Sequence, residues 1–330
     1  MTKPMPYEYG LHKVRCGWPD HAVVVLHGIR QTEKDMRPFA EAIAAALPGP
    51  AIYTYGYDHT RPLGFSGATL NGHLQKCLPD GRVDLVGYSM GGLVARLAAT
   101  EHEGSNVHTV VTLATPNRGS LSNTELTLIG QLGRQALEFL SPILPRSEGV
   151  RDLTRARTIM RQRRNRLMKG NPAFVLDGDK RRYVSIPALW YSTDKADFEF
   201  GPSVTMSGVV AGFKLLGLKA KLENMKKSHD GIVTEASNNL VLADGHDWAE
   251  FQLVKPGASA APAICHAVTE VCDQHDHISI VRFDEHDPDA IARTEAIARL
   301  VSALVATADW RDLKKHHPEF VHARLHPFAV

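Results

Sequence analysis

The strongest structural signal in this chain is Val83-Asp84-Leu85-Val86-Gly87-Tyr88-Ser89-Met90-Gly91-Gly92. An apolar run leads into Gly-x-Ser-x-Gly, and a helix-forming run over 93–100 follows at once. This order predicts a strand, a sharp turn and a helix, with the Ser89 hydroxyl clear of its neighbours at the carboxyl end of a sheet. Ser89 is therefore the predicted nucleophile. The amide of Met90, at the helix start, is a predicted oxyanion donor.

Strands and helices alternate on both sides of this turn. We expect strands over 22–26, 51–55, 83–86 and 107–113. Helices are expected over 35–47, from 64–67 to near 79–81, and over 93–100. The β-branched run over 22–26 is typical of a strand buried on both faces. The alternation predicts an α/β fold built on a mostly parallel, doubly wound sheet with helices on both faces.

The rhythm breaks after residue 120. The pattern over 121–185 is helical, a strand is expected over 186–192, and a second irregular segment covers 194–228. A last strand over 248–254, a long loop to His277 and a final helix over 288–307 complete the prediction. We therefore divide the chain into a core (1–120, 186–193 and 229–330) and two largely helical lid insertions (121–185 and 194–228).

A serine nucleophile needs an acid that orients its base, and on an open α/β sheet the chain order is Ser, Asp or Glu, His. Asp230, in His-Asp-Gly-Ile-Val, follows Ser89 in that order and is the predicted acid. Asp194 and Asp197 are alternatives because they directly follow the strand expected over 186–192. A loop aspartate also forms turns and caps helices, so position alone leaves these alternatives open.

The predicted base is His277, in the loop before the final helix. Ile278 and Ile280 would anchor the chain that follows and hold the imidazole still. His275 and His266 are the alternative bases in the same region. A lone loop histidine is often only solvated, so the choice depends on where the loop places each ring.

The second oxyanion donor is expected in the loop after the strand over 22–26. The amide of Ile29, in His27-Gly28-Ile29, is the predicted donor. The predicted substrate-binding residues are His27, Tyr88 and Asn117. His27 also fits a structural role in bracing its loop.

Together these segments resemble the α/β-hydrolase superfamily, and within it bacterial triacylglycerol lipases and esterases related to the GPI-inositol deacylase. The resemblance implies that the aspartate of the Asp-Gly-Ile-Val element, Asp230, is the triad acid and that His277 is the base. The segments that carry it are Leu26-His27-Gly28, Gly87-Tyr88-Ser89-Met90-Gly91-Gly92, 113–120, 190–192 and 230–233.

The chain departs from the lipase pattern at three positions. Tyr88 stands where lipases usually have histidine before the nucleophile, and Asn117 stands where the Thr-Pro-His element has histidine. Ser279 occupies the place of an aspartate that binds calcium in one lipase subfamily, so that calcium site is not expected. None of these changes removes a triad residue.

Composition narrows the partners. A net charge of +2 is too small to suggest nucleic acid binding. The segment over 151–166 is rich in arginine, which fits either a solvated lid helix or contact with anionic lipid headgroups. The apolar run over 209–218, with lysines behind it, fits an acyl-pocket wall or a membrane interface.

No metal or cofactor is expected. The spacing of the Cys and His residues over 265–277 fits no common zinc pattern. The four cysteines form no regular framework and read as reduced thiols. With no signal peptide or transmembrane run visible, a cytoplasmic protein is expected.

The sequence thus predicts a serine hydrolase of carboxylic esters, with a small-molecule or lipid substrate. An acyltransferase, a thioesterase or an amidase would use the same nucleophile. A non-catalytic binding protein is disfavoured, because Ser89, Asp230 and His277 occur in order beside both oxyanion segments.

Overall fold

The computed structural model describes residues 9–100, 106–117, 148, 152, 181–189, 199–200, 204–205, 233, 238, 264–284, 286–308, 312–320 and 324–327. The helices are α1 (Arg37–Ala46), α2 (Leu63–Cys77), α3 (Met90–Thr100), α11 (Pro288–Ala306) and α12 (Leu313–His316), with short 3-10 turns η3 (Cys272–Gln274) and η5 (Pro318–Phe320). The strands are β1 (Gly10–Arg15), β2 (Trp18–Leu26), β3 (Pro50–Gly56), β4 (Arg82–Tyr88), β5 (Val107–Leu113), β6 (Arg182–Ile186), β7 (Glu199–Phe200), β8 (Val204–Thr205), β9 (Ile264–Val268) and β10 (Arg324–Pro327).

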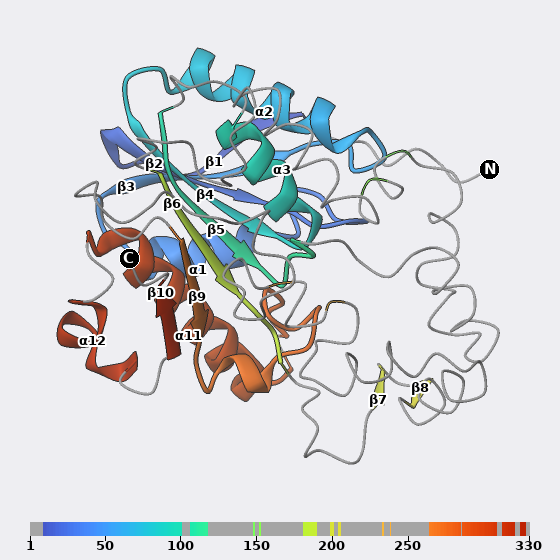
Figure 1. Ribbon diagram of the computed structural model, residues 1–330, viewed down its shortest axis with the longest axis vertical. Coiled ribbons are helices and arrows are strands. Elements are labelled where there is room, and N and C mark those ends of the chain that lie inside the picture. The colour runs from blue at the N-terminus through green and yellow to red at the C-terminus, as the bar shows by residue number, and fades with distance from the viewer. Residues whose placement is uncertain are drawn as a thin grey trace.

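One eight-stranded sheet organises the molecule, in the order β1-β3-β2-β4-β5-β6-β9-β10 (Figure 1). The inner strands from β3 to β9 run parallel, and the edge strands β1 and β10 are antiparallel to their neighbours. The predicted α/β class with a mostly parallel, doubly wound sheet is confirmed. A separate antiparallel pair joins β7 to β8.

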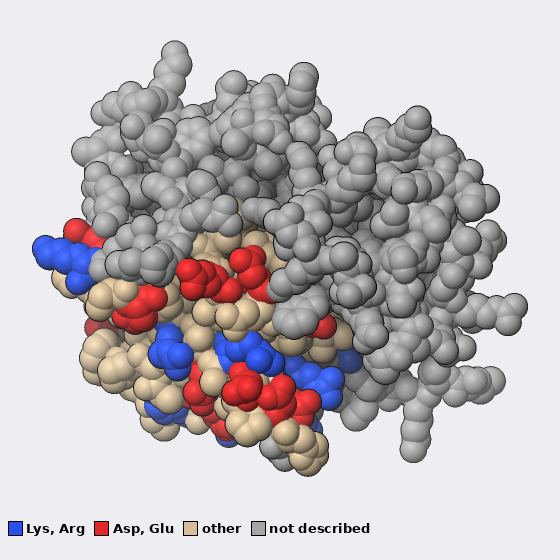
Figure 2. Space-filling view, turned by 90° about the horizontal axis from the view of Figure 1, so that it is seen from below, with Lys and Arg blue, Asp and Glu red and all other residues tan. Residues whose placement is uncertain are grey.

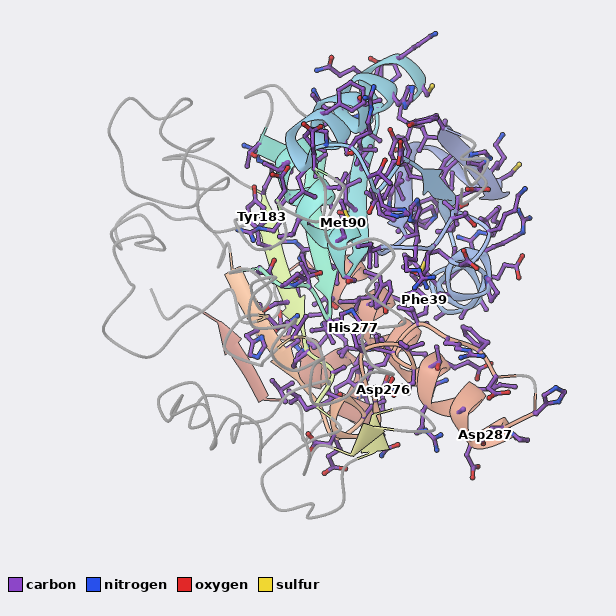
Figure 3. All side chains as sticks on the ribbon, turned by 90° about the vertical axis from the view of Figure 1, so that its right-hand side faces the viewer. Phe39, Met90, Tyr183, Asp276, His277 and Asp287 are labelled. Carbon is purple, nitrogen blue, oxygen red and sulfur yellow. The ribbon has the colours of Figure 1, made fainter. Side chains whose placement is uncertain are left out.

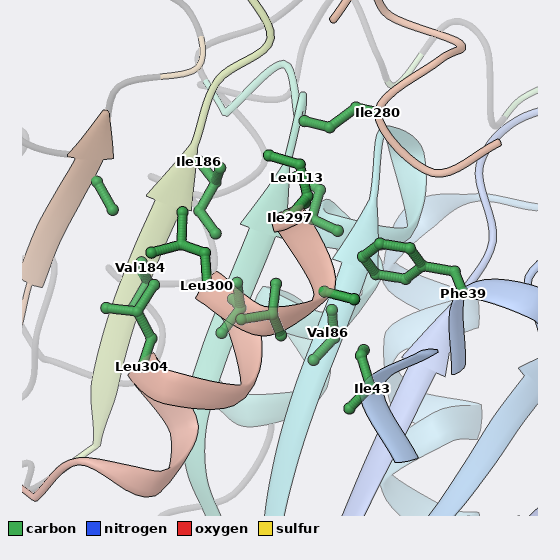
Figure 4. Packing of buried hydrophobic residues seen from close by; sticks show 14 of the residues in the cluster. Phe39, Ile43, Val86, Leu113, Val184, Ile186, Ile280, Ile297, Leu300 and Leu304 are labelled. Atoms are coloured by element: carbon green, nitrogen blue, oxygen red, sulfur yellow. The ribbon is translucent and has the colours of Figure 1, made fainter. Parts of the chain in front are cut away.

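Both faces of the sheet are buried, and β2 shows how. Val23 and Val25 belong to the core cluster that includes α1 and α11, whereas Val24 and Leu26 belong to the cluster that includes α2 and α3. Successive side chains of a strand point to opposite faces, so a strand between two helical layers must be apolar at every position. Figure 4 shows α11 and Phe39 of α1 packed over the first of these faces.

A buried charge cluster joins the amino ends of the central strands. Asp84 of β4 is completely buried, and its Oδ2 lies 2.6 Å from His21 Nε2 and accepts a hydrogen bond from Arg82 Nε at 3.0 Å. His108 Nδ1 lies 3.4 Å from the other carboxylate oxygen. Although burial alone raises the pKa of Asp84, the bonds from His108 and His21 and the charge of Arg82 outweigh it and hold that pKa well below its usual range.

The strand expected over 186–192 is wrong in position. β6 covers Arg182–Ile186, so the predicted lid boundary at 185 falls inside a strand of the core sheet. Pro187 has no backbone N–H to donate to a ladder, which explains why the strand ends there. The strand was missed because it begins with a charged residue, Arg182. This arginine is buried and donates to the carbonyls of Leu304 and Val305 at the end of α11.

The long loop expected before His277 is also partly wrong, because it contains β9. His266, one of the alternative bases, is a buried residue of this strand, and its Nδ1 lies 2.8 Å from Ser185 Oγ of β6. His266 interrupts the otherwise apolar run of β9, and its polar partner lies on a different strand. The strand expected over 248–254 lies outside the described residues.

The lid insertions lie almost wholly outside the described residues, as do 209–218 and all of 151–166 except Asp152. Asp152 Oδ2 accepts a hydrogen bond of 2.9 Å from the backbone N–H of Leu63, the first residue of α2. Pro62, the N-cap residue of that helix, makes no side-chain capping hydrogen bond, so Asp152 caps the first N–H of the helix instead. The lid architecture stays a prediction.

The described surface carries charges of both signs. Figure 2 shows basic and acidic side chains interspersed over the described part of the face seen from below, so that part has no extended field of one sign. No helix in the described ranges is both long enough and apolar enough to cross a membrane. The four cysteines are free thiols, and Cys265 and Cys272 are buried.

Candidate active site

Ser89 forms the turn between β4 and α3. β4 ends at Tyr88 and α3 begins at Met90, and Ser89 has a φ of 50°, in the left-handed region that non-glycine residues rarely adopt. Its N–H donates to the carbonyl of Leu113, at the end of β5, over 2.8 Å. A strained residue that the surrounding structure holds in place is a feature of functional sites.

The turn is tight because glycines let its two sides meet. A Cβ on Gly87 would lie 2.5 Å from the carbonyl carbon of Gly91, closer than real Cβ atoms approach other atoms. The strand can therefore pass this near to the helix only without side chains at these positions. Packing therefore explains why the motif has glycine at position 87.

His277 meets Ser89 at the carboxyl end of the sheet. Its Nε2 lies 3.0 Å from Ser89 Oγ, within the range for hydrogen bonding between a nucleophile and its base. Each of the two residues is 6% exposed, so the pair is largely shielded from solvent. In Figure 3, His277 and Asp276 lie on the loop before α11, near the ends of the central strands.

A small hydrogen-bonded turn shapes the loop that carries His277. Asp276 Oδ1 accepts from the backbone N–H groups of Ile278 (2.9 Å) and Ser279 (2.7 Å), and Ser279 Oγ accepts from the N–H of Asp276 (2.9 Å). Thr294 of α11 then donates to the carbonyl of Ser279. Ser279, at the position of the calcium-binding aspartate in one lipase subfamily, serves here to close this turn.

The alternative base His275 has a different environment. It is completely buried, and its Nδ1 lies 3.3 Å from Ser279 Oγ. Burial lowers its pKa. Of the histidines weighed from the sequence, His277 is the one whose ring nitrogen lies at hydrogen-bond distance from Ser89 Oγ in the described residues.

The loop after β2 lies directly against the nucleophile. A Cβ on Gly28 would stand 2.8 Å from Tyr88 Cε1 and 3.1 Å from Ser89 Cβ. The backbone of Gly28 thus passes close to Ser89, and Ile29 is the next residue of this loop. Gln31 Oε1 accepts from the Gly28 N–H at 3.0 Å and folds this loop back on itself.

His27 is completely buried beneath that loop. Its Nδ1 lies 2.8 Å from the Gly28 carbonyl, its Nε2 accepts from the Tyr57 N–H at 3.3 Å, and its ring stacks on Tyr57 at 4.2 Å. Tyr57 Oη also donates to the His27 carbonyl over 2.8 Å. Burial lowers the pKa of His27 to about 4. These contacts favour the bracing role over contact with substrate.

Asn117 is buried at the end of the β5 loop, where it joins three parts of the chain. Its Oδ1 accepts from Arg96 NH1 of α3 at 3.0 Å, and its Nδ2 donates to Thr112 Oγ1 at 3.1 Å and to the Asn238 carbonyl at 2.6 Å. Asn238 Nδ2 returns a bond of 3.2 Å to the Thr115 carbonyl. An amide used this fully favours positioning of the loop over substrate binding.

Arg96 and Tyr57 were not singled out from the sequence. A detectable signal for Arg96 was a single arginine inside the apolar run 93–100, which a buried helix accepts only with partners. Tyr57 follows a strand without a motif around it.

Asp230, Asp194 and Asp197 lie outside the described residues, so the acid stays a prediction. Within the described ranges no group of three or more His, Cys, Asp or Glu side chains could hold a metal ion.

Comparisons with known proteins agree with this architecture. Residues 74–134, which include β4, Ser89, α3 and β5, match the family described as "PGAP1-like alpha/beta domain". Phospholipase PlaB from Legionella pneumophila is similar in structure, with a TM-score of 0.55 and 13% identity over 92% of this chain and 63% of that one. The chain therefore spans less than two thirds of PlaB.

The mature lipase BlEst2 of Bacillus licheniformis matches 82% of this chain and 92% of its own, with 18% identity and a TM-score of 0.49. A search of curated proteins found no match. At these identities the structural matches speak to fold alone. Sheet order, elbow geometry and the match to the PGAP1-like domain together show that this chain has the α/β-hydrolase fold and resembles the esterases and lipases built on it.

Proposed function

We propose that this chain is a serine hydrolase that cleaves carboxylic esters, with Ser89 as nucleophile and His277 as base. The observation that carries the proposal is the 3.0 Å separation between Ser89 Oγ and His277 Nε2, at a serine with a φ of 50°. A neutral serine hydroxyl is a poor nucleophile, and an imidazole at this distance removes that limitation.

The reaction follows from these two groups. Ser89 Oγ attacks the acyl carbon while its proton passes to His277 Nε2, and a tetrahedral oxyanion forms. The imidazolium then protonates the departing alkoxide, which leaves as the alcohol. Water, deprotonated by His277, then attacks the acyl-enzyme and forms a second tetrahedral intermediate. When this intermediate collapses, the carboxylic acid leaves and His277 returns the proton to Ser89 Oγ.

The amides of Met90 and Ile29 are the proposed oxyanion donors. Met90 is the first residue of α3, and the first N–H groups of a helix have no partner inside the helix. Ile29 follows Gly28, whose backbone abuts Ser89. Two backbone donors fixed on a strand loop and a helix start would need no rearrangement as the charge develops.

Asp230 is the proposed acid. Val233, in the same Asp-Gly-Ile-Val element, is buried, and the carbonyl of Asn238 further along accepts from Asn117 at the carboxyl edge of the sheet. The chain after Asp230 therefore reaches the edge where Ser89 and His277 lie. Leu189, before Asp194, is likewise buried and donates its N–H to the Cys272 carbonyl, so the chain reaches this edge there as well. The preference for Asp230 over Asp194 and Asp197 therefore follows the resemblance of its Asp-Gly-Ile-Val element, and the substitutions below decide between the three.

The substrate is proposed as a small-molecule or lipid ester. The triad chemistry also serves acyl transfer to an alcohol and cleavage of thioesters or amides. Added glycerol would divert acyl groups to acylglycerol in a transferase, and matched thioester and amide substrates would show the other preferences. A chain-length series from C2 to C16 p-nitrophenyl esters, with and without anionic vesicles, separates a soluble esterase from a lipase that works at an interface.

The primary test compares the wild type with Ser89→Ala. We expect the wild type to hydrolyse p-nitrophenyl esters and to react with a fluorophosphonate probe, and Ser89→Ala to lose both while its unfolding midpoint is retained. Probe labelling that persists in Ser89→Ala would contradict the proposal. For the acid, Asp230→Asn should lower kcat far more than Asp194→Asn or Asp197→Asn, and the opposite ranking would reassign it.

A further inference from the structure

Tyr88 connects the nucleophile to the base. It is the last residue of β4, directly before Ser89, and its side chain is buried. Tyr88 Oη donates a hydrogen bond of 2.7 Å to the backbone carbonyl of His277. The two rings also lie against each other, with centroids 5.4 Å apart and planes tilted by 42°.

The Tyr88 ring also contacts the loop after β2. Gly28 approaches so closely that a Cβ there would stand 2.8 Å from Tyr88 Cε1 and 2.9 Å from Cδ1. One buried ring therefore contacts the strand loop that would supply an oxyanion donor and the imidazole that would supply the base. Its own backbone continues into Ser89.

The bond to the His277 carbonyl supplies what the turn around Asp276 does not. The hydrogen bonds between Asp276, Ile278 and Ser279 fix the shape of the His277 loop, but they are internal to that loop. Tyr88 fixes the main chain of His277 relative to β4. Since β4 is a central strand that leads directly into Ser89, this bond links the main chain of His277 to the strand that carries Ser89.

We propose that Tyr88 is a positioning residue, which holds the His277 main chain through its hydroxyl and keeps the imidazole within reach of Ser89. This inference rests on the proposed function. The hydroxyl donates to a carbonyl and takes no part in proton transfer. At this position, where lipases usually have histidine, the tyrosine ties the main chain of the base to β4.

The test is Tyr88→Phe, which removes the hydroxyl and keeps the ring against Gly28 and His277. A displacement of about 1 Å at a reacting group costs on the order of a hundredfold in rate. The loss of one anchor in a loop that keeps its own turn should cost less. We expect kcat for p-nitrophenyl butyrate to fall about tenfold or more, with KM within about twofold, because ground-state binding is not disturbed.

Tyr55→Phe is the matched control. Tyr55 is a completely buried tyrosine on β3, and its Oη lies 3.0 Å from His73 Nδ1 of α2, whereas the Tyr88 hydroxyl bonds to the loop of His277. Tyr55→Phe, like Tyr88→Phe, removes the hydroxyl of a buried tyrosine. A general effect of that loss on folding would therefore appear in both variants. We expect its kcat and KM to equal those of the wild type.

The kinetic measurements test the role of Tyr88 and the proposed function separately. Turnover is counted per active site titrated with the fluorophosphonate probe, and unfolding midpoints are measured for both variants. A Tyr88→Phe protein with wild-type kcat per titrated site overturns the inference, even if less of it is folded. A wild type without Ser89-dependent labelling overturns the proposed function and the inference with it. A reduced kcat per titrated site in Tyr88→Phe alone supports both.

Discussion

Acid should weaken this fold through His27, whose ring is buried under the proposed oxyanion loop. The Gly28 carbonyl can only accept, so His27 Nδ1 carries the hydrogen, and Nε2 is the acceptor for the Tyr57 N–H. Both nitrogens are thus used by the neutral tautomer. A second proton would place an N–H on Nε2 against another N–H donor, inside a site without solvent contact.

The direction and size of the effect follow from the pKa of His27. Burial lowers it from 6.5 to about 4, so between these values the unfolded chain binds a proton that the folded chain excludes. Stability therefore falls as the pH drops from 6.5 toward 4 and is unaffected by this group above 6.5. Since each tenfold change in proton affinity is worth about 1.4 kcal/mol, the loss reaches about 3 kcal/mol at most, and about 2 kcal/mol by pH 5.

The assay is urea unfolding of the wild type and of His27→Gln between pH 8 and pH 4. Burial also lowers the pKa values of His59 and His275, which titrate in both proteins. The difference between the two curves of unfolding free energy against pH therefore isolates His27. We expect the variant to be less stable at pH 8, where the brace is lost, and to have the shallower dependence on pH.

Parallel curves for the two proteins would refute this reasoning. They would mean that His27 binds a proton equally well in the folded and unfolded states, which is incompatible with a ring whose two nitrogens both serve backbone groups. A steeper curve for the variant would have the same meaning. Activity at each pH is measured on the same samples, because the brace lies under the proposed oxyanion loop.

Two further predictions concern buried polar groups. Asp84→Asn removes the negative charge of the cluster at the amino ends of the strands, so the nearby buried Arg182 loses an opposite charge. The free energy of unfolding should fall by about 3 kcal/mol or more in urea titrations. A change below about 1 kcal/mol would contradict the stabilising role of the cluster. Asn117→Ala removes the side-chain bonds that join Arg96 of α3 to Asn238, so kcat should fall several-fold with little change in KM. An unchanged kcat would show that this network does not position the site.

Local pattern was sufficient for the first half of the chain. The strand over 107–113 and the elbow at Ser89 agree with the structure, and the strands over 22–26 and 51–55 differ from β2 and β3 only at their ends. These strands lie between two helical layers and are apolar at nearly every position, so a few adjacent residues are enough to predict them. Glycines at a strand–helix turn are equally local.

The later strands were misplaced for the opposite reason. β6 begins with Arg182, whose guanidinium is stabilised by the last carbonyls of α11, and β9 contains His266, which pairs with Ser185. Each polar residue finds its partner on an element far away in the sequence. A pattern read over neighbouring residues therefore misses these strands, because buried polar groups are permitted only by partners that the fold supplies.

The sequence alone determined the class of the fold and placed Ser89 at a strand–helix turn, because both are properties of short contiguous segments. It also favoured His277 over His275 as the base, because Ile278 and Ile280 follow His277, but it could not show which ring reaches Ser89. Tertiary structure separates them: the turn around Asp276 and the hydroxyl of Tyr88 hold the loop so that His277 lies 3.0 Å from Ser89, while His275 is buried beside Ser279. A nucleophile can be encoded by one local turn, but a base is defined by its distance to another part of the chain, and only the packed molecule sets that distance.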